Sequence, residues 1–275
     1  MEKAAIGAMA PLRENGDSFR DVRELGLSVC QLVSWEEGFW SPDCARCVVE
    51  HASRDGVRVS AFWAGWPGPR VWDFLEGPQT LGIVPRAHRQ PRVAALKKAG
   101  EFARLIGTPA IITHLGFIPE NPNDPVFGEV VEAVRDIARH LATLGMQFWF
   151  ETGQETPVTM LRLIQAVGTD NLGVNLDPAN LVMYGKANAV DALDLLGPYV
   201  KNVHAKDGVY PVDPMRLGAE VKVGQGRVDW PRLMTRLSEV GYRGELIIER
   251  EISGGQQRKD IIETVAYLRG LLRQH

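Results

Sequence analysis

The chain has 275 residues, of which 45% are hydrophobic and 24% charged, and its formal net charge is −3. This is the composition of a globular protein with a sizeable core, and the lack of a basic excess argues against a nucleic-acid partner. Residues 1–11 lack the long apolar core of a signal peptide, and no run approaches the ~20 apolar residues of a membrane span. We therefore expect a cytoplasmic protein without a membrane partner.

Short apolar or β-branched runs alternate with helical patterns along the whole chain. In chain order the runs cover residues 5–9, 28–33, 57–63, 110–115, 147–151, 172–177, 200–205 and 245–249. The helical spacing of apolar residues predicts helices over 42–54, 91–106, 126–144 and 261–272. Such alternation is typical of βα units and a parallel sheet. Because eight strands occur without a linker or a change in composition, we expect one α/β domain over residues 1–275, a closed (β/α)8 TIM barrel, a fold of about 250 residues.

Two of the predicted strand-to-helix connections are long, over residues 64–90 and 116–125. Both follow the carboxyl ends of strands, the face on which such barrels build their sites. Both contain Trp or Phe together with Pro and Gly, and we expect them to form lids or substrate walls. The segment at 5–16, AIGAMAPLRENG, lacks the glycine spacing that a dinucleotide site needs.

Each of the last four predicted strands ends in a residue type that can ligate a metal ion. QFWFE ends at Glu151, LGVNLD at Asp177, VKNVH at His204 and ELIIE at Glu249. A single polar residue at a strand end is commonly a helix N-cap or a loop contact. In a barrel, however, neighbouring strand ends converge on one mouth, so four in succession can meet over a common point.

Two Glu, one Asp and one His would bring three negative charges together with one imidazole. Without a counter-ion the carboxylates would repel one another, and at least one would have to stay protonated. A divalent cation resolves this, and oxygen-rich ligation with one imidazole suits Mn²⁺ or Mg²⁺ and could accept Co²⁺, Ni²⁺ or Zn²⁺. The alternative is that the acids pair with a cationic side chain at the barrel mouth, for which Lys206 is available. We predict one divalent metal ion held by Glu151, Asp177, His204 and Glu249.

The same strand ends resemble those of a known family. The chain contains FETG at 150–153, NLDPANL at 175–181, VHAKD at 203–207, GQGRVDW at 224–230 and IIERE at 247–251. In this order and at these strand ends the motifs resemble the xylose isomerase-like TIM barrel superfamily, in particular its sugar isomerase/epimerase branch with the ketohexose 3-epimerases and inosose dehydratase. The N-terminal half is similar only in general architecture. The resemblance implies that the four residues bind one divalent metal and that the two Glu exchange protons with the substrate.

The chemistry of these residues agrees with that function. A metal that bridges a ketone oxygen and the adjacent hydroxyl acidifies the C–H bond between them and stabilises the resulting enediolate. Two carboxylates on opposite faces can then act in sequence, one removing the proton and the other returning it. We therefore expect Glu151 and Glu249 to be the acid/base pair and Asp177 and His204 to be mainly ligands. The predicted protein is a metal-dependent epimerase or isomerase of a small-molecule sugar, keto-sugar or keto-glycoside.

Five further residues are candidates for substrate contact, each with a structural alternative. His114 ends the fourth strand and faces the same mouth, unless its ring is bonded into the loop. Lys206 can donate to a substrate hydroxyl or form a salt bridge with its neighbours. Asn180 can bind a hydroxyl or cap the next helix, and Trp63 can offer an apolar face to a sugar ring or lie in the barrel core. Arg227 lies in a Gly-flanked loop that can approach a ligand, but it can equally be a surface charge.

Two positions depart from the 3-epimerases that the chain resembles. Those enzymes carry a His three residues beyond the metal Asp and an Arg six beyond the metal His, where this chain has Asn180 and Tyr210. Both family residues hold substrate hydroxyls, so their absence argues against a free ketohexose. The HAKD run is closer to inosose dehydratase and to members that act on oxidised glycosides. A lyase or dehydratase acting on an inosose or a 3-keto-glycoside at the same metal site therefore stays open, and a homo-oligomer is compatible with this kind of barrel.

Overall fold

The computed structural model describes residues 4–274, and residues 1–3 and 275 at the two ends of the predicted domain lie outside the described part. Eight parallel strands pair in the order β1-β10-β7-β6-β5-β4-β3-β2 and close into a barrel. They are β1 (Ile6–Pro11), β2 (Val29–Ser34), β3 (Arg58–Ala64), β4 (Ala110–Thr113), β5 (Gln147–Glu151), β6 (Leu172–Leu176), β7 (Val200–Ala205) and β10 (Leu246–Ile248). The predicted (β/α)8 fold class is thereby confirmed. The first and last residue of each strand differ from the predicted ones by at most two positions.

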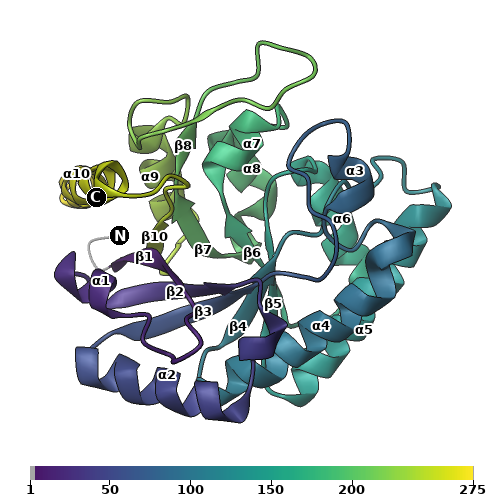
Figure 1. Cartoon of the computed structure of the whole chain (residues 1–275). Coiled ribbons are helices and arrows are strands. Elements are labelled where there is room, and N and C mark those ends of the chain that lie inside the picture. Colours follow the sequence, from purple (N-terminus) through teal and green to yellow (C-terminus); the bar gives the residue numbers. More distant parts are fainter. Residues whose placement is uncertain (1–3, 275) are drawn as a thin grey trace.

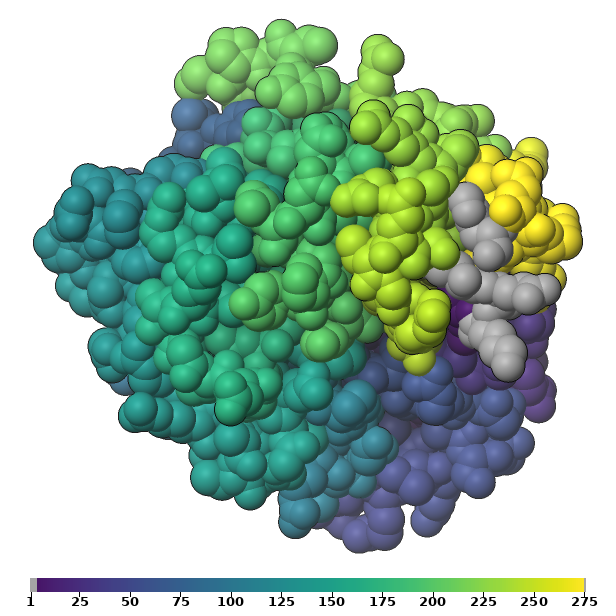
Figure 2. Space-filling model, turned by 180° about the vertical axis from the view of Figure 1, so that it is seen from behind, coloured from purple at the N-terminus to yellow at the C-terminus, as the bar shows by residue number. Residues whose placement is uncertain are grey.

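Helices surround the barrel on its outside (Figure 1). They are α1 (Arg20–Glu24), α2 (Pro42–Asp55), α3 (Gly77–Thr80), α4 (Arg86–Leu105), α5 (Pro125–Thr143), α6 (Pro157–Val167), α7 (Pro178–Met183), α8 (Ala189–Leu196), α9 (Trp230–Glu239) and α10 (Gly255–Leu272), with single 3-10 turns η1 (Glu37–Phe39) and η2 (Gly197–Tyr199). Seen from behind, the colours follow the chain around the surface from blue through teal and green to yellow (Figure 2). The ring closes because β1 pairs with β10, with Ile6 beside Leu246.

Several helices begin with the same local device, a polar cap residue followed directly by proline. Ser41, Asp124 and Thr156 each accept a hydrogen bond from a backbone N–H of the first turn of α2, α5 and α6, and Pro follows each of them. The cap satisfies one of the N–H groups that the first turn leaves unpaired, and proline has the backbone angle of the helix already. The predicted starts of α2 and α5 therefore agree with the structure to within one residue.

The predicted start of helix 91–106 was wrong, because α4 already begins at Arg86 and contains Pro91 in its second turn. Proline this close to the helix start removes only one hydrogen bond. The first turns are also held from outside the helix, since Arg89 donates to the backbone oxygens of Ile83 at 2.8 Å and Val84 at 2.5 Å. These tertiary contacts outweigh the local signal of the proline. The last helix, α10, likewise begins before its predicted start, at Gly255.

Two segments outside the barrel lie at the carboxyl ends of the strands. The connection after β3 carries the short helix α3, and a small antiparallel pair, β8 (Asp207–Gly208) with β9 (Glu220–Val221), follows β7. The loop between β8 and β9 extends away from the barrel (Figure 1), and the side chain of Val212 in it is fully exposed. Within residues 4–274, none of the helices combines the length and the apolar character that crossing a bilayer requires.

Candidate metal centre

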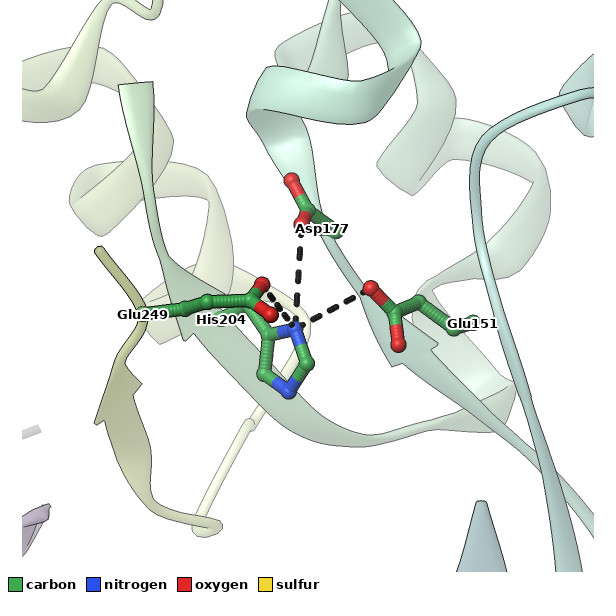
Figure 3. A group of neighbouring side chains, drawn as sticks. All are labelled: Glu151, Asp177, His204 and Glu249. Carbon is green, nitrogen blue, oxygen red and sulfur yellow. Dashed lines mark ion pairs between the residues drawn. The ribbon is translucent and has the colours of Figure 1, made fainter. Parts of the chain in front are cut away.

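The four predicted ligands lie together at the mouth of the barrel. Each offers one ligand atom, and these atoms all lie within 4.8 Å of one another. Figure 3 shows the four side chains pointing toward one another. Glu151 is the last residue of β5, Asp177 follows β6 and caps α7, His204 lies in β7, and Glu249 follows β10. Their strands are neighbours in the order β10-β7-β6-β5, which is why residues so far apart in the sequence meet.

His204 occupies the centre of the group. Its Nδ1 lies 3.1 Å from Glu249 Oε2, 3.2 Å from Glu151 Oε1 and 3.7 Å from Asp177 Oδ2. On the other side of the ring, Nε2 lies 2.8 Å from Oε1 of Gln31, a fully buried residue of β2. When a metal ion occupies the site, an Nε2–H bond to Gln31 leaves the lone pair of Nδ1 free to bind it. Such a bond is the usual way in which proteins orient a metal-binding histidine.

Two buried atoms of this group have no hydrogen-bond partner among the described residues: Nδ1 of His204 and Oδ2 of Asp177. The other oxygen of Asp177, Oδ1, accepts the backbone N–H of Asn180 at 2.8 Å, so this residue caps α7 and faces the site at once. A buried polar atom without a partner costs about 1–3 kcal/mol. A cation between the four side chains would satisfy both atoms, and three carboxylates with one imidazole are donors that suit a divalent ion. The residues therefore fit a metal, whose identity the donor set leaves open.

Burial disfavours the charged form of each of these groups, but their mutual attraction outweighs it for three of them. Nearby histidines hold the pKa of Glu151 well below its usual range. Lys206 and His204 lower the pKa of Glu249 to about 2, and Glu151 and Glu249 raise the pKa of His204 well above normal. Asp177 is the exception, since burial raises its pKa. Glu151 and Glu249 are thus carboxylates at neutral pH, the form that a general base requires.

Lys206 forms ion pairs with its acidic neighbours. Its Nζ lies 3.0 Å from Glu251 Oε1, 3.2 Å from Glu249 Oε2 and 3.7 Å from Asp177 Oδ2, and the side chain is buried. Burial disfavours its charge, but Glu249 and Asp177 raise the pKa of Lys206 well above normal, so it stays cationic. The salt bridge considered for Lys206 is therefore present. Lys206 pairs with Glu249 and Asp177 and forms no ion pair with Glu151, whose Oε1 lies 3.2 Å from His204 Nδ1.

Two of the predicted ligands, Glu151 and Glu249, line a cavity of about 420 Å³. Three predicted substrate contacts line it as well, and each touches Glu151. Asn180 Nδ2 donates to Glu151 Oε1 at 3.2 Å, His114 Nε2 lies 3.4 Å from the same oxygen, and Trp63 Nε1 donates to Oε2. These side chains reach both the carboxylate and the open space in which a ligand would lie.

Arg227 and Lys206 are not among the residues that line this cavity. Arg227 is exposed, and its backbone N–H donates to the oxygen of Gly208 at 2.8 Å. Tyr210, at the position where the resemblance led us to expect an arginine, is also exposed, and its hydroxyl donates to the oxygen of Gly185 at 3.4 Å. A substrate contact by Arg227 or Lys206 stays a prediction.

Several residues of the site were not predicted from the sequence. Inside the barrel, fully buried amides support His204: besides Gln31, Asn175 Nδ2 lies 3.0 Å from His204 Nε2, and Asn202 Nδ2 donates to Asn175 Oδ1 at 2.5 Å. Amides in otherwise apolar strands were a signal that could have found them, because a buried amide needs partners. At the outer end, the predicted wall 64–90 contributes Arg70 and Trp72 to the cavity, and Trp35 follows β2.

Comparisons with known proteins agree with the barrel fold. The family model described as xylose isomerase-like TIM barrel matches residues 19–271. A xylose isomerase domain protein from Planctomyces limnophilus has 33% sequence identity and a TM-score of 0.93, with 98% of each chain covered. The fold is shared with 3-keto-D-glucoside 4-epimerase from E. coli, which has 16% identity and a TM-score of 0.73, with 98% of this chain and 100% of that chain covered.

A curated relative is less informative about function. An uncharacterized protein of Methanocaldococcus jannaschii is 25% identical over 187 residues, which are 64% of this chain and 62% of that protein, so the match spans less than two thirds of the relative's length. The family model and the Planctomyces structure each cover most of the chain. The chain therefore belongs to the xylose isomerase-like TIM barrel family.

Proposed function

We propose that the protein is a divalent-metal-dependent epimerase or isomerase of a sugar, keto-sugar or keto-glycoside, with Glu151 and Glu249 as its acid/base pair. The observation that carries this proposal is the convergence of four ligand atoms within 4.8 Å of one another beside a cavity of about 420 Å³. The fold shared with a 3-keto-D-glucoside 4-epimerase supports the reaction class. Mg²⁺ and Mn²⁺ are the ions that the oxygen-rich donor set favours.

A divalent cation bound by the four residues would polarise a substrate carbonyl and stabilise the negative charge that develops on its oxygen. The proton transfers fall to the two glutamates, because both line the cavity and both are ionised. One carboxylate removes the proton from the carbon next to the carbonyl, which leaves an enediolate. The other glutamate first takes up a proton from solvent and then donates it to the same carbon from the opposite face, which inverts the centre. If the proton is instead added to the former carbonyl carbon and the hydroxyl proton of the enediolate is transferred to the new hydroxyl, the carbonyl moves. Asp177 and His204, fully buried, serve as ligands.

Glu151 is the more firmly oriented of the two carboxylates. Trp63 donates to one of its oxygens, while Asn180 and His114 contact the other. Glu249 has fewer partners, namely Lys206 and His204, and its side chain keeps 16% of its exposure. A carboxylate held by several donors keeps the alignment that proton transfer requires.

The decisive experiment is metal analysis of the purified protein, followed by proton NMR in D₂O with ketoses, inososes and 3-keto-glycosides. We expect one divalent ion per chain and solvent deuterium retained on the carbon next to the carbonyl of an isomeric product. Asp177→Asn should lower metal binding, and Glu249→Gln should lower the exchange about a thousandfold. Glu50→Gln, at an exposed position of α2 far from the cavity lining, is the matched control.

Other outcomes would assign the site differently. Loss of a hydroxyl or a glycosidic group without deuterium retention would replace the epimerase by the lyase or dehydratase alternative, in which a β-substituent leaves before the proton returns. A protein that holds no metal, and in which Glu249→Gln leaves sugar binding intact, would be a binding module, and the proposal would be abandoned.

A further inference from the structure

We propose that Arg70 determines specificity by binding an anionic group, a carboxylate or a phosphate, at the end of the sugar substrate remote from the reacting carbons. This inference rests on the proposed function, because it places the reacting carbons at Glu151 and Glu249. Arg70 lies in the long connection after β3, and no role was predicted for it from the sequence.

The position of Arg70 in the cavity is the first argument. Of the described residues that line the cavity, it is the only Lys or Arg, whereas Glu151, Glu249 and Glu251 are acids. Two aromatic rings separate it from the inner end: Trp63 donates to Glu151, the Trp63 and Trp35 ring centroids are 5.0 Å apart, and the Arg70 guanidinium lies 4.4 Å from the Trp35 centroid. Arg70 and Glu151 line the same cavity of about 420 Å³, so one ligand that fills it contacts both ends. A substrate anion can thus reach Arg70 while the other end of the molecule lies at the predicted metal ligands.

The second argument is that the guanidinium of Arg70 has no partner other than the Trp35 ring. Among residues 4–274 it forms no ion pair and no side-chain hydrogen bond, although the stacked ring covers one of its faces. The edge of a stacked guanidinium presents paired N–H groups that match the two oxygens of a carboxylate or phosphate. Arg89 and Arg92 of α4 differ, since Arg92 uses its donors on backbone oxygens and Arg89 uses its donors on backbone oxygens and on Glu129.

The third argument is that the backbone on both sides of Arg70 is held in place. Arg92, buried in α4, donates to the oxygen of Pro69 at 2.7 Å, and also to those of Pro67 at 3.1 Å and Gly82 at 2.5 Å. On the other side, the N–H of Val71 donates to Thr80 Oγ1 at 3.0 Å. A binding group on a fixed support loses little conformational freedom when a ligand arrives. The backbone that carries Arg70 is therefore preformed, and the exposed side chain lies against Trp35.

The charge of the cavity sets the direction in which such a substrate lies. At the inner end, three carboxylates offset the charge of the predicted cation and Lys206 is paired with Glu251, so no net positive charge is left there for a substrate anion. The same anion beside Arg70 is attracted. Arg70 would thus select anionic sugars and also align their reacting end with the metal ligands.

The test compares three probes that share one carbon skeleton: D-fructose, D-fructose 6-phosphate and D-fructuronate. Binding to the Mg²⁺-loaded protein is followed by tryptophan fluorescence, since Trp35, Trp63 and Trp72 line the cavity. We expect at least one of the anionic probes to bind about tenfold more tightly than D-fructose, and Arg70→Gln to remove that advantage while changing D-fructose affinity by less than about twofold. Arg104→Gln, which alters an exposed arginine in the last turn of α4, should behave as wild type.

The two anionic probes also distinguish the group that is recognised. A gain confined to D-fructose 6-phosphate assigns a phosphate, a gain confined to D-fructuronate assigns a carboxylate, and competition by inorganic phosphate should follow the first case. Equal affinity of the wild type for all three probes, or an advantage that survives in Arg70→Gln, would overturn the proposal.

The outcomes separate this inference from the proposed function. If neutral ketoses or 3-keto-glycosides exchange deuterium while Arg70→Gln binds every probe as the wild type does, the function stands and the anion site is rejected. If no sugar exchanges deuterium but anion binding depends on Arg70, the anion site stands and the proposed reaction is rejected.

Discussion

The two halves of the barrel mouth carry different chemistry. The ends of β5, β6, β7 and β10 bring together the four predicted metal ligands, whereas the ends of β2 and β3 bring together Trp35 and Trp63. His114, at the end of β4, lies between them and contacts both Glu151 and Trp72. We therefore expect the charged half to carry out the proposed reaction. We expect the aromatic half to determine which substrate shapes fit the cavity. The hydrogen bond from Trp63 to Glu151 joins the two.

Each half is also held by a buried charged residue that binds backbone groups, and the two residues have opposite charge. In the charged half, the carboxylate of Asp207 accepts the N–H groups of Gly208, Gly224, Gly226 and Val228. In the aromatic half, the guanidinium of Arg92 donates to three carbonyl oxygens. Asp207 requires glycine beside it, since a Cβ at Gly226 would lie 2.0 Å from its Oδ1. Both loops are thereby fixed by buried hydrogen bonds, and the connection after β3 is also held by the apolar packing of Trp66 and Leu81.

The largest effect that tests this division is expected in the charged half. Glu249→Gln removes one of the two proposed proton-transfer groups but keeps the size of the side chain. General acid–base groups contribute about 10²–10⁴-fold, so we expect deuterium exchange to fall about a thousandfold. Metal affinity should fall much less, because three ligands remain. Exchange at the wild-type rate, measured beside Glu50→Gln, would move the chemistry away from this half of the mouth.

A second prediction concerns Glu155, a buried acid of the charged half whose two oxygens have no hydrogen-bond partner among the described residues. Burial raises its pKa to about 7. Between about pH 4.5 and 7 the folded protein therefore keeps a proton that the unfolded chain releases, and the free energy of unfolding falls as pH rises through this range. Relative to Glu155→Gln, the wild type should lose up to about 3 kcal/mol from about pH 5 to about pH 8. Urea unfolding at the two pH values measures this, and parallel pH profiles of both proteins would contradict it.

The matching test in the aromatic half is Arg92→Met. The variant leaves three carbonyl oxygens without their donor but also removes a buried charge, and we expect the free energy of unfolding to fall by about 2 kcal/mol. Tryptophan emission should shift to longer wavelength, since the connection that carries Trp66 and Trp72 loses its support. Arg104→Met is the control for loss of an arginine from α4. Unchanged stability and emission would show that this connection is held by other contacts.

The smallest effect is expected where the two halves meet. Trp63→Phe keeps a ring in the cavity but removes the N–H that donates to Glu151. A hydrogen bond to a charged group contributes about 1.5 kcal/mol or more, so kcat/KM for proton exchange should fall about tenfold. Metal content and stability should change little. If kcat/KM stayed at the wild-type value, the orientation of Glu151 would depend on Asn180 and His114 instead.

Local patterns were sufficient for the strands and for the predicted metal ligands. Each strand is a short apolar run, and the ligand type at the end of QFWFE, LGVNLD, VKNVH and ELIIE is visible in the run itself. Parallel strands of a closed barrel place their carboxyl ends on one face, so the convergence of Glu151, Asp177, His204 and Glu249 followed from the count and order of the strands alone.

The remaining contacts depend on how the barrel closes. Gln31 reaches His204 across the barrel, from a position 173 residues away in the chain, and Arg70 lies on Trp35 only because the connection after β3 folds back over β2. The start of α4 and the ion pairs of Lys206 likewise depend on contacts that form only in the folded barrel. Sequence periodicity reports which face of an element is buried, and says nothing about which side chain of a distant element meets it there. That pairing is set by strand register and by loop paths, which exist only once the ring of strands is complete.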